Sequence, residues 1–200
     1  DEFWKSETDL ELYANGFIQK MIPGDGTITR GDIYADYCAV DIPTEGKKLQ
    51  KAMKNPELQK ALKDGKLLSE TIKDDKALAD IKFPVFVADI DGATKYILPI
   101  YGAGLWGPIW GYISLDDNKD TVYGTFFDHQ GETPGLGAEI TTPEFNKEFR
   151  NKQIFSGNQL VGILVVKGGN ASGANEVDAI SGGTITSKGV ETMIKNYLTY

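Results

Sequence analysis

The segment from Asp178 to Ser187 has the clearest capacity for chemistry in this sequence. Its adjacent glycines, Gly182 and Gly183, precede three hydroxyl residues and lead directly into an amphipathic helical pattern. The first N–H groups of a helix lack intrahelical partners and lie at the positive end of the helix dipole, so they favour an anion. The segment therefore predicts a phosphate site that needs no basic side chain. The simpler alternative is a glycine turn with Thr186 or Ser187 acting only as the helix N-cap.

Two further glycine-rich segments could bring backbone close to a flat ligand. Residues 131–139 read GETPGLGAE, and residues 104–110 read GLWGPIW. Glycine permits such a close approach because it has no side chain. The alternative for residues 131–139 is a loop that closes a strand. Trp106 could either cover a ring-shaped ligand or cap the protein core.

His129 and Cys38 are the single histidine and the single cysteine of the chain. One of each cannot build an intramolecular disulfide, a structural zinc site or an iron–sulfur cluster. His129 ends an expected strand without a partner at triad spacing, so we expect a satisfied or surface residue. Glu132 could act as a general base, but no nucleophile is placed near it by the sequence. We therefore assign no catalytic residue and no metal ligand, and a hydrolase that uses His129 and Glu132 is the weakest hypothesis.

Composition excludes some classes of protein. The 200 residues include 21 Lys and Arg against 29 Asp and Glu, which gives a formal net charge of −8. Such an acidic chain is a poor partner for the phosphate backbone of nucleic acids. The longest apolar run, residues 160–166, is far shorter than the ~20 residues of a membrane helix. A content of 40% hydrophobic and 25% charged residues is typical of a globular protein.

The elements that must position these segments indicate an α+β fold, an antiparallel β-sheet with packed helices. Short β-rich stretches separated by Asp and Asn turns predict a meander of four strands, at residues 84–88, 96–100, 110–115 and 121–127. Leucines at helical spacing predict one or two helices within residues 46–75.

Three elements are expected after the meander. Pro143 should begin a helix that reaches residue 151, with Thr142 as its N-cap. Residues 160–167 predict a buried strand, and residues 187–198 predict a final amphipathic helix. We expect two regions, an N-terminal helical or irregular part over residues 1–82 and a ligand-binding domain over residues 83–200.

Together the three segments resemble the FMN-binding domain family, which occurs in the C subunit of the sodium-translocating NADH:quinone reductase and in the G subunit of the Rnf complex. In that family an Asp-x-x-x-Gly-Ala-Ser/Thr-x-Thr motif receives FMN as a phosphoester on its last Thr. Asp178, Gly182, Thr184 and Thr186 match the motif. The resemblance thus implies Thr186 as the acceptor. Gly183 stands where the family usually has Ala, and we expect reduced rigidity there without loss of function.

The resemblance also implies a wider set of FMN-binding residues. Besides Thr186 they are Leu105, Trp106, Glu132, Thr133, Gly135, Leu136, Lys167, Ser181, Gly182, Gly183, Thr184 and Ser187. Five of them should line the isoalloxazine, namely Leu105, Trp106, Glu132, Thr133 and Leu136. Trp106 is the expected ring partner.

Four residues have more specific expected roles. Ser187 should be the N-cap of the last helix, and Thr184 should hydrogen-bond the phosphate. Asp178 should take part in recognition by a separate flavin transferase that uses FAD and Mg²⁺. Thr186 should hold the flavin covalently.

The implied function is an FMN-carrying electron-transfer subunit of a Na⁺-exporting NADH:ubiquinone reductase. The resemblance implies that NADH and quinone bind to other subunits. The family's C subunit has an N-terminal membrane helix and a flavin domain on the outer, periplasmic face of the inner membrane. This chain is then expected to be a soluble, monomeric fragment without that helix.

Two alternatives remain open from the sequence. An Rnf-type electron transport subunit would have a different set of partners, and the pair Leu105-Trp106 disfavours it. A reversible extracytoplasmic binding module for FMN or another phosphorylated ligand would use the same glycine turn without a covalent bond.

Overall fold

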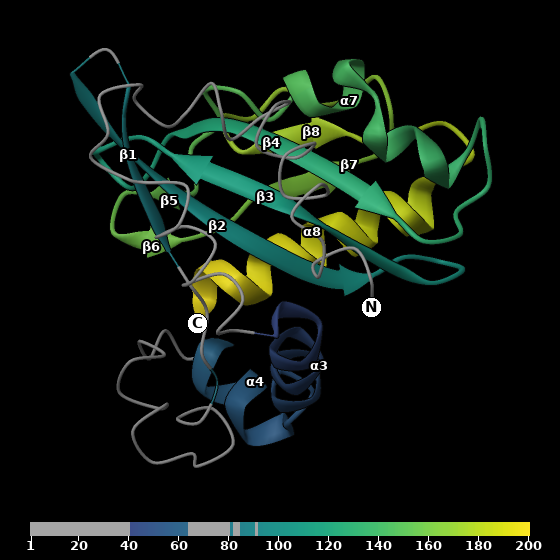
Figure 1. Cartoon of the computed structure of the whole chain (residues 1–200), viewed down its shortest axis with the longest axis horizontal. Helices are drawn as coiled ribbons and strands as arrows, with labels where there is room; N and C mark the ends of the chain where they lie inside the picture. Colours follow the sequence, from purple (N-terminus) through teal and green to yellow (C-terminus); the bar gives the residue numbers. More distant parts are fainter. Residues whose placement is uncertain (1–40, 64–80, 82–84, 91) are drawn as a thin grey trace.

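A four-stranded antiparallel sheet is the centre of the fold (Figure 1). The computed structural model describes residues 41–63, 81, 85–90 and 92–200. The strands follow one another in the order β1-β2-β3-β4, so the meander predicted from the sequence is confirmed. Their bounds are β1 Phe86–Ile90, β2 Ala93–Ala103, β3 Pro108–Leu115 and β4 Val122–His129.

The C-terminal helix α8, Thr184–Thr199, lies across one face of this sheet and packs on β2 (Figure 1). Two glycines permit this close approach. A side chain at Gly189 of the helix would collide with the Ala103 carbonyl oxygen, and one at Gly102 of the strand would meet Met193 Cβ at 2.8 Å. The absence of both side chains therefore sets how near the helix lies to the strand.

Within the described residues, two short helices precede the sheet. They are α3, Ile42–Ala52, and α4, Pro56–Lys63. Asp41 is the N-cap of α3 and accepts a hydrogen bond from the backbone N–H of Thr44 at 3.1 Å. The rest of the helical stretch expected over residues 46–75, from residue 64 on, lies outside the described residues, as does Cys38. The division of the chain after residue 82 stays a prediction.

The segment after β4 contains the 3₁₀-helix η2, Gly137–Thr141, and the helix α7, Pro143–Lys147. Thr142 is the N-cap of α7, as predicted, and accepts from the Phe145 N–H at 3.4 Å. The helix expected to reach residue 151 is shorter than predicted. Turns follow it up to Asn151, whose φ of 60° cannot continue a helix.

The buried strand predicted over residues 160–167 is wrong as a single element. The chain forms a small hairpin, β5 Phe155–Ser156 with β6 Gln159–Leu160, and then β7, Leu164–Val166, which pairs in parallel with β8, Glu176–Asp178. Gly162 interrupts the run with a φ of 69°. The Val161 and Gly162 N–H groups turn to the Ile154 carbonyl, which removes them from any ladder.

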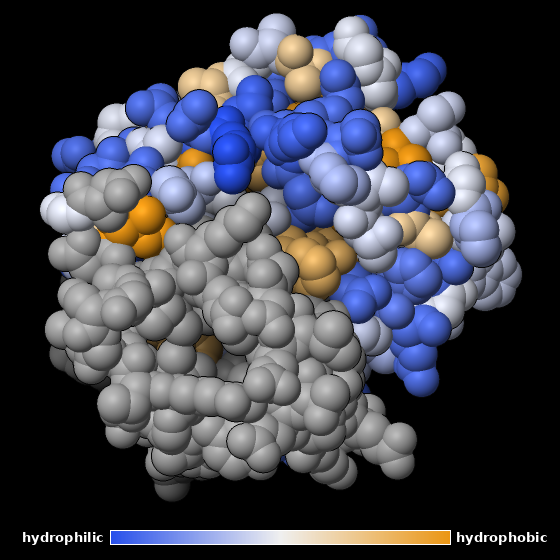
Figure 2. Space-filling view, turned by 45° about the horizontal axis from the view of Figure 1, so that its top comes forward, coloured by the Kyte–Doolittle hydropathy of each residue, from blue (hydrophilic) through white to orange (hydrophobic). Residues whose placement is uncertain are grey.

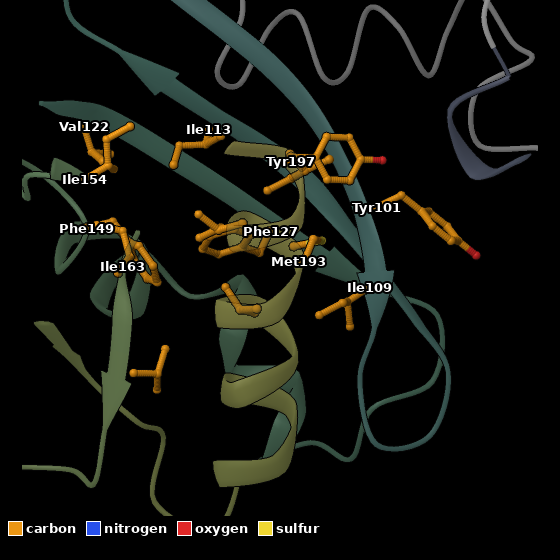
Figure 3. Packing of buried hydrophobic residues seen from close by; sticks show 14 of the residues in the cluster. Tyr101, Ile109, Ile113, Val122, Phe127, Phe149, Ile154, Ile163, Met193 and Tyr197 are labelled. Atoms are coloured by element: carbon orange, nitrogen blue, oxygen red, sulfur yellow. The ribbon is translucent and has the colours of Figure 1, made fainter. Parts of the chain in front are cut away.

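The hydrophobic core is built from residues of the sheet, α8 and the α7 region, together with α3, α4 and the β7–β8 pair; Figure 3 shows part of it. Three phenylalanines form its aromatic centre. Phe149 packs edge-on against Phe127 at a ring distance of 5.1 Å and against Phe145 at 5.2 Å. On one face of the molecule hydrophilic side chains predominate over the described residues, with separate apolar patches between them (Figure 2). None of the helices in the described ranges is both long enough and apolar enough to span a bilayer.

We expect Phe149→Ala to lower the free energy of unfolding by about 3–5 kcal/mol, because the ring is fully buried and leaves a cavity. Denaturant titration followed by circular dichroism measures the loss. Phe155→Ala is the matched control, since Phe155 is 37% exposed and should change stability by only about 0.5 kcal/mol. Equal losses in the two variants would contradict this description of the core.

Candidate functional site

A pocket of about 260 Å³ lies where the β2–β3 turn, the loop after β4 and the start of α8 meet. It brings together all three segments that the sequence singled out, although they are far apart in the chain. The lining residues are Leu105, Trp106, Glu132, Thr133, Leu136, Gly137, Gly182, Gly183, Thr184, Ile185 and Thr186. Nine of the residues expected to bind a cofactor are in this set.

Large apolar side chains stand at the pocket with much of their surface in water. Trp106 is 68% exposed, Ile185 61%, Leu105 46% and Leu136 42%. Apolar side chains of this size gathered at one concave site are typical of a ligand-binding pocket. Trp106 does not cap the core, so that alternative is wrong.

The start of α8 differs from the prediction. The backbone of Gly182, at φ 72°, turns the chain so that the helix begins at Thr184, three residues before the expected start. The N-cap is Gly183, and no side chain among the described residues caps the helix. The N–H groups of the first turn therefore remain available to an anion at the pocket.

Ser187 is not the N-cap, and the prediction that it would be is wrong. It lies within the first turns of α8 and is fully buried. Its hydroxyl donates to the Gly183 carbonyl at 2.9 Å and accepts from the Ile180 N–H at 3.1 Å. Ser187 therefore ties the helix to the preceding turn from inside. Thr186 is likewise inside the helix, so the simpler assignment of either residue as N-cap is excluded.

The base of the pocket holds a buried pair formed by Glu132 and Thr186. The Thr186 hydroxyl donates to Glu132 Oε2 at 2.5 Å, and the Trp106 N–H donates to Oε1 at 2.8 Å. Thr186 is 1% exposed and Glu132 is 5% exposed. These two residues are 54 positions apart, and no spacing in the sequence predicted their contact.

Two glycines leave the space that the Glu132 carboxylate occupies. A side chain at Gly104 would collide with Oε1. A side chain at Gly137 would collide with Oε2 and would also lie 2.6 Å from Thr186 Oγ1. Gly104 and Gly137 both lie in segments whose glycines predicted a close approach to the backbone. They were therefore the sequence signal for a group packed at these two positions. Gly137 and Ile185 are the pocket residues that the sequence reasoning missed.

His129 holds the loop that carries Glu132. The imidazole Nδ1 of His129 accepts a hydrogen bond from the backbone N–H of Glu132 at 3.1 Å. The backbone N–H of His129 donates to Asp128 Oδ1 at 2.7 Å. His129 is therefore satisfied, as expected. A hydrolase that uses His129 and Glu132 as a pair gains no support, since His129 Nδ1 bonds to the backbone N–H of Glu132 and not to its carboxylate. The described residues contain no group of three or more His, Cys, Asp or Glu that could hold a metal ion.

The remaining expected residues do not line the pocket. They are Gly135, Lys167, Ser181, Ser187 and Asp178. Gly135 shapes the loop after β4 at a φ of 74°, and its N–H donates to Glu139. The Asp178 carboxylate accepts from the Asn170 and Ala171 N–H groups at 2.9 and 3.0 Å, and so orders the loop after β7.

Gly183 is closely surrounded. A side chain there would meet the Leu136 carbonyl oxygen at 2.9 Å and Ile180 Cγ2 at 3.0 Å. The expected loss of rigidity at this position is therefore small, because neighbouring backbone and side-chain atoms already confine it.

The three pocket segments lie within a stretch that matches a known family. Residues 104–199 match the family model described as FMN-binding domain. These residues belong to the FMN-binding domain family. The matched stretch contains every residue that lines the pocket.

Several relatives of this FMN-binding domain are known. The chain is 41% identical over 110 residues to the C subunit of the Na(+)-translocating NADH-quinone reductase of Pasteurella multocida, covering 55% of this chain and 42% of that protein. It is 35% identical over 143 residues to the C subunit of the Vibrio campbellii reductase, covering 68% of this chain and 55% of that one. The match thus spans about half the length of these curated relatives.

A solved structure of the C subunit of the same kind of reductase, from Parabacteroides distasonis, is also similar. It superposes with a TM-score of 0.58 at 55% sequence identity, over 62% of this chain and 63% of that chain. The antiparallel sheet with packed helices is therefore the fold of an FMN-binding domain of this kind.

We expect Trp106→Ala to shift the absorption spectrum and the midpoint potential of FMN held by the domain, because the indole is the largest apolar surface at the pocket. The unfolding midpoint should change little, since the side chain is mostly in water. Trp106→Phe is the control and should keep most of the wild-type spectrum and potential. An unchanged spectrum and potential in Trp106→Ala would show that the ring does not contact Trp106.

Proposed function

We propose that this chain carries FMN as a phosphoester on Thr186 Oγ1 and serves as an electron-transfer subunit of a sodium-translocating NADH:quinone oxidoreductase. The observation that carries the proposal is the position of the Thr186 hydroxyl. It lies at an apolar pocket, in the first turn of a helix that no side chain of the described residues caps. The family match and the names of the similar proteins support the same function.

The pocket has separate places for the two chemically different parts of FMN. Leu105, Trp106 and Leu136 offer apolar surface that suits a flat isoalloxazine ring. The first turn of α8 has no acidic residue, and its backbone N–H groups suit the phosphate. The residues present therefore fit FMN.

The residues would act on the flavin by position and environment. Bound FMN supplies reversible redox chemistry that no side chain of the protein provides. The apolar residues at the pocket exclude water from one face, and the Thr186 oxygen fixes where the phosphate lies. The site would thus hold a redox group at a fixed place on the protein surface, as an electron carrier requires.

The partners follow from this proposal. A separate flavin transferase would attach the FMN, and Asp178 would contribute to its recognition by keeping the loop beside the motif ordered. The donor and acceptor of electrons would be other subunits of the membrane complex, with this domain on the periplasmic face of the inner membrane. An N-terminal membrane helix would anchor the full-length protein.

The structure also presents a competing acceptor. Thr184 lies at the same pocket and is exposed, whereas Thr186 is 1% exposed. Accessibility alone would favour Thr184. The motif and the position at the base of the pocket favour Thr186.

We expect Thr186→Val to abolish covalent flavin, because valine keeps the branched shape and removes the oxygen. The variant should also lose about 1–3 kcal/mol of stability, because the buried Glu132 carboxylate loses a hydrogen-bond donor. Thr184→Val is the matched control and should only weaken the modification. Each protein is produced with a flavin transferase, then denatured and precipitated, and its peptides are mapped by mass spectrometry. Flavin mapped to Thr184 or Ser187, or retained covalently in Thr186→Val, would refute the assignment. Yellow colour released to the supernatant by the wild type would indicate reversible binding instead.

A further inference from the structure

We propose that Glu132 is the general base that takes the proton of the Thr186 hydroxyl when the flavin is attached, and that the finished phosphoester converts this contact into a repulsion. The inference rests on the proposed covalent attachment to Thr186. It gives Glu132 a catalytic role in the attachment reaction. Without that role, the chain would only be the acceptor substrate of the flavin transferase.

The contact between Glu132 and the Thr186 hydroxyl has the geometry expected of a general base and the group that it deprotonates. The hydroxyl donates to Glu132 Oε2 at 2.5 Å, within the short range of hydrogen bonds to an ionised oxygen. The proton therefore points at the carboxylate, and the lone pairs of Oγ1 stay available for bonding to phosphorus. Among the described residues that line the pocket, Glu132 has the sole ionisable side chain.

The surroundings hold the carboxylate in place. The Trp106 N–H binds Oε1, and the Glu132 N–H binds His129 Nδ1, so both ends of the residue are fixed. Gly104 and Gly137 leave the space for the two carboxylate oxygens. Because Glu132 is 5% exposed, water does not compete strongly for its hydrogen bonds.

The transfer step balances with a flavin adenine dinucleotide as donor. A bond forms between Thr186 Oγ1 and the phosphorus of the FMN half, while the pyrophosphate bond to the adenylate half breaks and AMP leaves. The hydroxyl proton passes to Glu132 Oε2 and is then released to solvent, so Glu132 is a carboxylate again once AMP has left. No electron is gained or lost, so the step needs no oxidant or reductant.

The product changes the electrostatics of the pair. The esterified oxygen has no proton to donate, and the phosphodiester keeps one negative charge near Oε2. Glu132 then loses one of its two carboxylate partners and faces an anion, whereas a glutamine at this position could donate its amide N–H to the phosphoester. The same residue should therefore favour attachment and oppose the attached state.

The rate of attachment tests the first half of this proposal. Purified chains are incubated with a flavin transferase, FAD and Mg²⁺, and covalent flavin is followed by in-gel fluorescence. Loss of a general base should slow Glu132→Gln about 100-fold. Glu144→Gln is the matched control, because Glu144 is an exposed residue of α7 away from the pocket, and it should load at the wild-type rate. Equal rates for wild type and Glu132→Gln would overturn the proposal, whereas absence of covalent flavin on Thr186 in the wild type would overturn the proposed function itself.

Stability of loaded and unloaded protein tests the second half. After long incubation, the rise in unfolding midpoint on loading should be larger for Glu132→Gln than for the wild type. A purely structural role would shift both forms of the variant equally, and that result would contradict the repulsion. If Glu132→Gln fails to load at all while its circular dichroism is unchanged, the base assignment is supported.

A second pair of variants keeps the test valid if Glu132→Gln does not fold. Glu132→Asp keeps the carboxylate but withdraws it from Oγ1, so it should load more slowly than the wild type. Gly137→Ala should also slow loading because its Cβ displaces the pair, whereas Gly131→Ala, which has open space around it, should not. Wild-type rates in both Glu132→Asp and Gly137→Ala would overturn the proposal.

Discussion

The close approach of α8 to β2 is the constraint on which the site depends. Gly189 of the helix lies against the Ala103 carbonyl, and Gly102 of the strand lies against Met193. With larger residues at these positions the helix would stand farther from the sheet. Its first turn would then no longer lie beside the β2–β3 turn, where Leu105 and Trp106 are. The pocket exists because the backbone of a helix end and the backbone of a strand end come together.

The same pocket combines a polar base with an apolar rim. At the base, Glu132 and Thr186 satisfy each other's hydrogen-bonding groups, so their burial is tolerated. At the rim, Trp106 and Ile185 remain largely exposed, although hydrophobic surface of this size is normally covered. A ligand with a flat apolar part and an anionic end complements both regions. The site is therefore organised for one end of a ligand to be fixed and the other to rest on apolar side chains.

The similarity to the reductase proteins bears mainly on the part of the chain that builds this pocket. The family model begins at Gly104, within the β2–β3 turn, and ends at Thr199, the last residue of α8. Helix α3 contacts the same sheet through Gly46, where a side chain would meet Tyr101 and Tyr197. The matched region and this preceding helix thus share one packing surface, on β2 and α8.

Much of the local structure was determined by the sequence itself. The strand pattern predicted the antiparallel meander, Thr142 and Pro143 marked the start of α7, and glycines marked the three segments that meet at the pocket. These features depend on neighbouring residues, whose preferences for turns, caps and strands can be read along the chain. Tertiary structure decided the rest. Gly162 divided an apolar run that resembled one strand, Gly182 moved the start of α8 ahead of Ser187, and Glu132 met Thr186 across 54 residues. A hydrogen bond between such distant residues depends on how the elements that carry them pack together. No spacing of residues in the sequence indicates that packing.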